Sequence, residues 1–167
     1  MDKNNKAHTG KAWKVGRHFD TDQILPSQYM LFPTIEEMAK HALEGIRPDF
    51  IPNVRRGDLL VGDENFGCGS SREQAPRVLK YIGIETVIAK SFASIFFRNA
   101  INIGLPVIVL PDAVDRIREG DRIEISFEKG VITNKTQGET YTFPPFPEFL
   151  MGIIKVGGLL QYAKSRS

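Results

Sequence analysis

The residues best suited to chemistry lie in one glycine-rich segment, Gly62–Gln74, which has the sequence GDENFGCGSSREQ. It places Gly67, Gly69 and Ser70 close together and leads into a helical pattern. Backbone N–H groups exposed at a helix start, together with the helix dipole, favour an anion there. Arg72 falls in the expected first turn, where a cation opposes the dipole, so an anionic ligand explains it better. A guanidinium binds a carboxylate or phosphate through two hydrogen bonds, and the segment therefore predicts an anion site.

Two overlapping patterns predict how this helix begins. Ser70-x-x-Glu73 and Ser71-x-x-Gln74 both have the form of a capping box, so we expect one serine to cap the helix and the other to stay free. Glycine, serine and a capping box also open many ordinary helices, so a purely structural helix start is the alternative.

The same segment argues against two other chemistries. Gly62-x-x-x-x-Gly67 resembles the start of a phosphate-binding P-loop, but Cys68 and Gly69 occupy the positions that require lysine and a hydroxyl residue. Cys68 could be a nucleophile, yet no histidine has a motif-like relation to it, so we expect a small buried thiol.

Two segments nearer the N-terminus could add side chains to a site. Arg17–Asp22 (RHFDTD) brings Asp20 and Asp22 together, and paired carboxylates serve metal binding or acid–base catalysis, although Asp-Thr-Asp is also an ordinary turn. Tyr29–Phe32 (YMLF) either staples against the helix that follows or lines a pocket for an apolar ligand group. The residues alone leave both alternatives open in each case.

The elements that must position these segments alternate in the middle of the chain. We expect strands at Leu59–Val61, Thr86–Ala89 and Val107–Leu110, a helix from about Arg72 to Ile82, and a second helix opened by Ser91. This order predicts a parallel sheet with crossover helices.

The flanking regions predict a compact α/β domain with an all-β addition. Before the sheet we expect a strand at Lys11–Val15 and a helix capped by Thr34-x-x-Glu37 that runs to Gly45. Pro147 opens a C-terminal helix, and a short second one follows it. Alternating residues predict three hairpin strands, at Arg122–Phe127, Gly130–Thr133 and Thr140–Phe143.

Composition limits the kind of protein. A chain of 167 residues suits one domain, and we expect a basic, flexible arm at residues 1–10 and a single domain over residues 11–167. The net charge of +2 argues against nucleic acid as the main partner, and neither a membrane span nor a signal peptide is recognisable. One cysteine, and three histidines without ligand spacing, exclude a disulfide within the chain and an iron–sulfur cluster of its own. Any metal must therefore come mostly from another chain, and we expect a cytoplasmic protein.

Four motifs together resemble the small subunits of 3-isopropylmalate dehydratase in the aconitase superfamily. The resemblance covers most of residues 11–165, and GCGSSRE after a strand is highly specific. The motifs are DTDQI (Asp20–Ile24), ENFGCGSSREQA (Glu64–Ala75), AKSFASIFFRNAINIGLP (Ala89–Pro106) and PEFLMGIIKVGGLLQY (Pro147–Tyr162).

The resemblance implies an α/β fold of the swivelling β/β/α type, equivalent to the mobile C-terminal domain of aconitase. It implies a separate large subunit, in a heterodimer or heterotetramer, that carries a [4Fe–4S] cluster as Lewis acid on its own cysteines. The implied reaction dehydrates 2-isopropylmalate, a small dicarboxylate, and rehydrates the product to 3-isopropylmalate in leucine biosynthesis.

The resemblance also assigns roles to single residues. Ser70 falls on the catalytic serine, Ser71 on its neighbour in the active site, and Arg72 on the arginine that binds a substrate carboxylate. Asp22 matches an aspartate of the active-site polar network. These roles suit the chemistry, because removing a proton next to a carboxylate creates an anionic transition state that needs fixed donors and a guanidinium.

Two positions depart from relatives of the family. Leu31 stands where relatives that use a third carboxylate have arginine, so we expect Leu31 to face an apolar group of the substrate. Ser94 replaces an arginine common in compact relatives, and we expect this change to affect only a local surface contact. A hydratase for dimethylmalate, citramalate or, less well, homocitrate is an alternative function. A more remote alternative is a non-enzymatic module that binds an anion.

Overall fold

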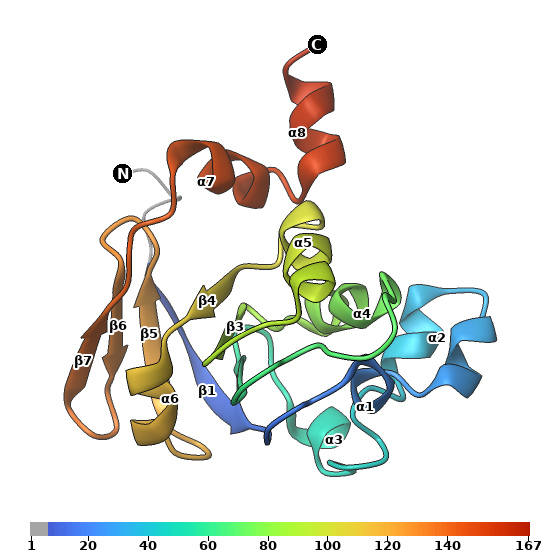
Figure 1. Cartoon of the computed structure of the whole chain (residues 1–167), viewed down its shortest axis with the longest axis horizontal. Helices are drawn as coiled ribbons and strands as arrows, with labels where there is room; N and C mark the ends of the chain where they lie inside the picture. Colours follow the sequence, from blue (N-terminus) through green and yellow to red (C-terminus); the bar gives the residue numbers. More distant parts are fainter. Residues whose placement is uncertain (1–6) are drawn as a thin grey trace.

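The computed structural model describes residues 7–167, whose seven strands form one mixed sheet with helices on its faces (Figure 1). The strand order is β4-β3-β2-β1-β5-β6-β7, so β1 joins a parallel half to an antiparallel half. The strands are β1 (His8–Lys14), β2 (Leu59–Val61), β3 (Thr86–Ala89), β4 (Val107–Val109), β5 (Arg122–Ser126), β6 (Val131–Asn134) and β7 (Glu139–Thr142). The helices are α1 (Thr21–Ile24), the 3₁₀ helix η1 (Ser27–Leu31), α2 (Ile35–Ala39), α3 (Phe50–Asn53), α4 (Gln74–Ile82), α5 (Ser94–Asn102), α6 (Pro111–Arg116), α7 (Glu148–Lys155) and α8 (Leu159–Ser165).

Strands β1 to β4 form the parallel sheet that the alternating pattern predicts. Leu60 of β2 aligns with Trp13 of β1 on one side and with Val87 of β3 on the other. Helices α4 and α5 connect β2 to β3 and β3 to β4, and both pack on the same face because successive right-handed crossovers run in one direction. The predicted strands Leu59–Val61 and Thr86–Ala89 have the observed bounds.

Successive strand residues point to opposite faces of the sheet, which gives the molecule two hydrophobic cores. On the face of α4 and α5, Leu60 and Val87 pack with Phe96. On the opposite face, Leu59 and Ile88 pack with side chains of α6 and β5. Because both faces are covered, β2 and β4 are continuous apolar runs, and β3 departs from one only at Thr86.

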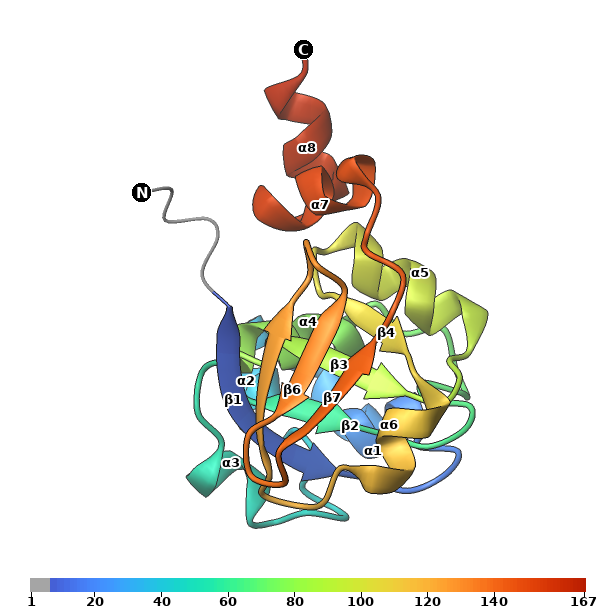
Figure 2. The ribbon, with the colours of Figure 1, turned by 90° about the vertical axis from the view of Figure 1, so that its left-hand side faces the viewer.

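Strands β5, β6 and β7 continue the same sheet beyond β1 as antiparallel neighbours. The first half of β1, His8–Lys11, pairs with β5, and Ala12–Lys14 pairs with β2. Figure 2 shows the antiparallel strands β5, β6 and β7 crossing in front of the parallel strands, so that they cover the second core. Helix α6 was not predicted, although Pro111 at its start is a signal for a helix N-terminus.

Several predicted boundaries are wrong for local reasons. Strand β1 begins at His8 rather than Lys11, because its first residues pair with β5. Residues 8–10 of the predicted arm therefore belong to the sheet, and residues 1–6 lie outside the described residues. Helix α2 ends at Ala39, and turns replace its predicted continuation to Gly45.

The C-terminal helices occur where Pro147 and the glycine pair after α7 predict them. Helix α7 lies over α5, and α8 projects from the body of the molecule in both views (Figures 1 and 2). Within residues 7–167, no helix combines the length and apolar character needed to cross a membrane.

Candidate active site

Loops after β1, β2 and β3 meet at the carboxyl edge of the parallel strands, the edge where ligands bind in sheets of this kind. They enclose a cavity of about 100 Å³. Its polar lining comes from three elements: Thr21 of α1, Ser70, Ser71 and Arg72 of the loop after β2, and Ser94 and Asn99 of α5. Three of the five predicted site residues therefore share one cavity.

Gly67 allows α5 to approach this loop closely. Its φ is +81°, and a Cβ at this position would lie 2.2 Å from Cγ of Phe96. Phe96 is buried near the start of α5 and packs edge-on against Phe66, with the ring centroids 5.2 Å apart. A side chain at residue 67 would push α5 away, so glycine keeps Ser70 and Ser94 on the same cavity.

Phe19 and Thr21, at the start of α1, hold the loop after β2 through hydrogen bonds. Three hydrogen bonds join them: Gly67 N–H to Phe19 O (2.7 Å), Thr21 N–H to Cys68 O (2.9 Å) and the Thr21 hydroxyl to Ser70 O (2.9 Å). Between these bonds Gly69 has a φ of +94°, a conformation that glycine adopts without strain. The local shape around Ser70 thus depends on a residue 49 positions earlier in the sequence.

Ser70 and Ser71 do not cap α4, so the predicted capping boxes are wrong. The helix begins at Gln74, and its N-cap residue Glu73 makes no side-chain capping bond. The chain turns tightly before the helix, where Arg72 N–H donates to Ser70 O over 2.8 Å. Arg72 also lies before the helix, so the argument from the helix dipole does not hold, and the guanidinium itself is the cation of the site. Both serines are exposed on the cavity, and the helix uses neither hydroxyl.

Arg72 is fixed by the fourth predicted site residue, Asp22. Its Nη1 lies 3.0 Å from Oδ1 of Asp22 and 3.4 Å from the carbonyl oxygen of Leu25. The Arg72 side chain is 21% exposed, whereas that of Asp22 is 62% exposed. Among the described residues both contacts use Nη1, so Nε and Nη2 remain available to a carboxylate. Asp22 and the Leu25 carbonyl therefore hold the guanidinium in place and leave two of its nitrogens for a ligand.

The two carboxylates of Arg17–Asp22 have different tasks. Asp20 is the N-cap of α1 and forms a capping box with Gln23, in which its side chain accepts from Gln23 N–H over 2.8 Å. Asp20 is therefore the ordinary turn residue, and Asp22 is the one that faces the site.

Comparisons with known proteins agree on one family. A model of the aconitase C-terminal domain matches residues 28–113. The 3-isopropylmalate dehydratase small subunit of Heliobacterium modesticaldum is 54% identical over 158 residues, which cover 95% of each chain. Small subunit 1 of Archaeoglobus fulgidus is 54% identical over 156 residues, 93% of this chain and 96% of that protein. The chain belongs to the family of 3-isopropylmalate dehydratase small subunits.

The fold expected of such a small subunit is confirmed. A crystal structure of 3-isopropylmalate dehydratase from Methanocaldococcus jannaschii superposes with a TM-score of 0.90 at 43% identity, over 96% of this chain and 95% of that one. Together with the family match, it confirms the predicted α/β fold related to the C-terminal domain of aconitase.

The single thiol of this small subunit is not set up as a nucleophile. Desolvation, helped by the negative charge of Asp20, raises the pKa of the partly buried Cys68 thiol. A raised pKa favours the protonated thiol, which is a poor nucleophile and a poor metal ligand. Over residues 7–167, no three His, Cys, Asp or Glu side chains are grouped so that they could hold a metal ion. The described part of the chain therefore offers no set of side chains that fits an iron–sulfur cluster.

Leu31, the fifth predicted site residue, does not line the cavity of the small subunit. It is the last residue of η1, and it is 90% exposed. The loop is anchored by Tyr29, which stacks on His41 with ring centroids 3.8 Å apart, and by Phe32, which meets the same ring edge-on at 5.5 Å. The aromatic residues thus staple the loop to the turns after α2, and Leu31 is left in solvent.

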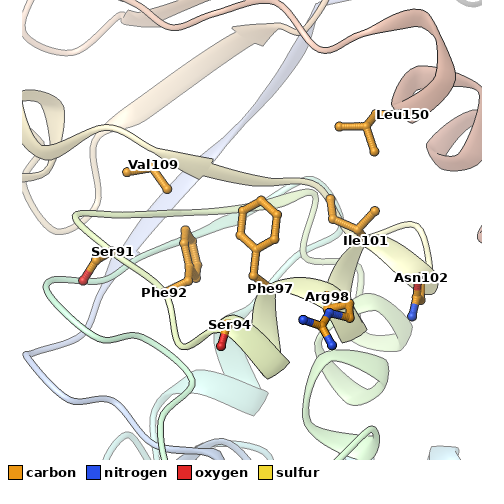
Figure 3. Close-up of a pocket in the computed structure, with 9 residues that line it drawn as sticks. All are labelled: Ser91, Phe92, Ser94, Phe97, Arg98, Ile101, Asn102, Val109 and Leu150. Atoms are coloured by element: carbon orange, nitrogen blue, oxygen red, sulfur yellow. The ribbon is translucent and has the colours of Figure 1, made fainter.

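An apolar groove of about 630 Å³ adjoins the cavity and shares Ser94 with it. Figure 3 shows Phe97 and Ile101 of α5 reaching toward Val109 of β4 and Leu150 of α7. Ser94 is exposed and lies between groove and cavity, so the position that departs from the compact relatives borders the candidate site. Thr21 was not predicted as a site residue, although it lies between Asp20 and Asp22.

Proposed function

We propose that this chain is the small subunit of a two-subunit hydro-lyase that interconverts 2-isopropylmalate and 3-isopropylmalate in leucine biosynthesis. The observation that carries the proposal is an exposed Ser70, unused by α4, on the same small cavity as the Arg72 guanidinium. The relatives named as small subunits of 3-isopropylmalate dehydratase support this choice of reaction.

In the proposed reaction, Ser70 removes the proton next to a substrate carboxylate. The electron pair left on carbon delocalises into the carboxylate, so negative charge grows there and needs a fixed cation. A serine oxygen is a weak base in water and becomes useful only where nearby donors stabilise its anionic form. Arg72 lines the same cavity and provides positive charge for both anions.

Arg72 binds the substrate carboxylate through the nitrogens that Asp22 does not use. Two parallel N–H···O bonds fix the carboxylate plane and so direct the neighbouring C–H bond. Asp22 acts as the polar partner that keeps the guanidinium oriented, with a bond of 3.0 Å. Ser71 completes the polar wall as a substrate-binding hydroxyl beside Ser70.

We assign the branched substituent of the substrate to the side of Leu31. Because Leu31 is exposed in the free small subunit, it joins the pocket only when the large subunit covers η1. Its apolar side chain suits the isopropyl group and also the methyl groups of dimethylmalate or citramalate, which keeps a related hydratase as the second candidate. A third carboxylate, as in homocitrate, would be buried without a cation at this position.

The remaining parts of the enzyme are assigned to the partner. This chain has one thiol and does not fit a cluster, so we place the [4Fe–4S] cluster, which supplies the Lewis acid, on a large subunit. The assembled enzyme is proposed to be cytoplasmic.

Reconstitution tests the proposal. The isolated chain should be colourless and inactive, and the complex with its large subunit should convert 2-isopropylmalate to 3-isopropylmalate, with citrate as the negative control. A complex that turns over dimethylmalate but not isopropylmalate would support the second candidate. A chain that binds dicarboxylates yet acquires no activity with the large subunit would favour the non-enzymatic anion-binding alternative.

A further inference from the structure

We propose that Thr21 is a positioning residue for Ser70, acting through one hydroxyl that bridges the carbonyl oxygen and the Oγ of that serine. The inference rests on the proposed function, because it takes Ser70 as the base. Thr21 is the first residue of α1, and the residue is only 2% exposed although it lines the cavity.

The geometry gives this hydroxyl two partners on one residue. Oγ1 of Thr21 donates to Ser70 O over 2.9 Å and lies 3.4 Å from Ser70 Oγ. A hydroxyl has a single proton, so while Thr21 donates to the carbonyl its oxygen can only accept from the Ser70 O–H. This contact favours the rotamer in which Ser70 Oγ stays near Thr21, whereas an exposed serine otherwise rotates freely.

The distance of 3.4 Å is at the long limit for two hydroxyls, so the bond to Oγ is weak in the resting subunit. Hydrogen bonds to an ionised oxygen are shorter and stronger. When Ser70 is in its anionic form, rotation about the Thr21 Cβ–Oγ1 bond moves the hydrogen bond from the carbonyl to Oγ. No proton leaves Thr21. When Ser70 takes up the substrate proton, the Thr21 hydroxyl returns to the carbonyl.

If the role of Thr21 were merely structural, its hydroxyl would only hold the loop in place. The chain contains a matched control for the loss of such a structural hydrogen bond. Thr86 is fully buried at the start of β3, and its hydroxyl donates to Pro106 O over 2.8 Å. It makes the same kind of bond, from a buried threonine to a backbone carbonyl, away from the residues that line the cavity. Thr86→Val therefore measures what losing such a bond does to stability alone.

The experiment compares Thr21→Val, Thr21→Ser and Thr86→Val in the enzyme assembled with its large subunit. Thr21→Val keeps the shape and removes the hydroxyl, and its kcat should fall on the order of tenfold to a hundredfold, the value of one hydrogen bond to a charged group. KM for isopropylmalate should stay unchanged, because Arg72 still binds the carboxylate. Thr21→Ser should restore kcat, and Thr86→Val should lower Tm as much as Thr21→Val while keeping kcat.

An isotope effect provides a readout that a structural role would not move. With substrate deuterated at the carbon that loses its proton, Thr21→Val should show a larger isotope effect on kcat than the wild type. An unchanged kcat in Thr21→Val, or an equal loss in Thr86→Val, would overturn the proposal. If Thr21→Val does not assemble, Thr21→Ala replaces it, and Ala must lower kcat where Ser does not. Failure of the proposed function would instead appear as a wild-type complex without isopropylmalate turnover, which is independent of residue 21.

Discussion

Replacing Gly67 with alanine tests whether the close approach of α5 to the loop after β2 builds the site. A Cβ at residue 67 would lie 2.2 Å from Cγ and 2.4 Å from Cβ of Phe96. Because Phe96 Cβ cannot rotate away from its own backbone, α5 or the loop must move. Overpacking of this kind costs about 1–3 kcal/mol. The φ of +81° adds about 1–2 kcal/mol for a residue with a Cβ. We therefore expect Gly67→Ala to lower the free energy of unfolding by about 2–5 kcal/mol.

Gly120→Ala is the matched control for the backbone part of this cost. Gly120 has a φ of +85°, and a Cβ there would meet no atom within 4 Å. Its substitution should therefore cost only the conformational part, about 1–2 kcal/mol. The difference between the two variants isolates the contact with Phe96.

Guanidinium unfolding of the small subunit, followed by circular dichroism, measures both free energies. In the assembled enzyme, Gly67→Ala should also lower kcat/KM for isopropylmalate, because Ser70 and Ser94 no longer frame the same cavity, whereas Gly120→Ala should not. If Gly67→Ala were no less stable than Gly120→Ala, the packing of Phe96 against this loop would be excluded as the feature that shapes the site.

Three further outcomes are expected. Arg72→Lys should raise KM for isopropylmalate more than it lowers kcat in steady-state assays, because an ammonium cannot bind a carboxylate through two parallel bonds; an unchanged KM would contradict the role of Arg72. Leu31→Arg should shift kcat/KM from isopropylmalate toward homocitrate, and equal losses on both substrates would mean that Leu31 does not face the substrate. Desolvation opposes ionisation of the buried Asp121, but N–H donors including Asn134 and Gln137 outweigh it and lower the pKa of this carboxyl. A lowered pKa means that the ionised carboxylate stabilises the fold at any pH above its pKa in the unfolded chain, about 3.9. This stabilisation is lost as the pH falls through the pKa in the folded protein. Asp121→Asn should therefore be less stable than wild type at neutral pH, and in denaturant titrations the difference should shrink below a pH of about 4; a difference independent of pH would refute the linkage.

The parts of the fold that follow from local pattern were predictable. Leu59–Val61 and Thr86–Ala89 are buried on both faces, so, apart from Thr86, each is an apolar run between turn residues. Helices α1 and α3 have only four residues each and carry no periodicity that could announce them. The pairing of His8 with β5 depends on a strand more than a hundred residues later in the chain, which no local pattern encodes.

The site shows the same division between local and long-range information. Ser70 and Arg72 were identified from residue type and spacing, and the structure places both on one cavity. Their capping pattern predicted the wrong conformation, because the hydrogen bonds from Thr21 and the approach of Phe96 decide the path of the loop. Leu31 was assigned to the substrate side from the family resemblance, because it stands where relatives that use a third carboxylate have arginine. Burial of this side chain depends on what covers the loop, and within this chain Leu31 is exposed.

Turnover of isopropylmalate by Ser70→Ala, assembled with the large subunit, tests the central claim most directly. Because Ser70 does not cap α4, the variant should assemble normally and keep the Tm of the wild type. Loss of the base should lower kcat by a factor of at least about 100. A complex that assembles with Ser70→Ala and keeps turnover near that of the wild type would contradict the assignment of Ser70 as the base.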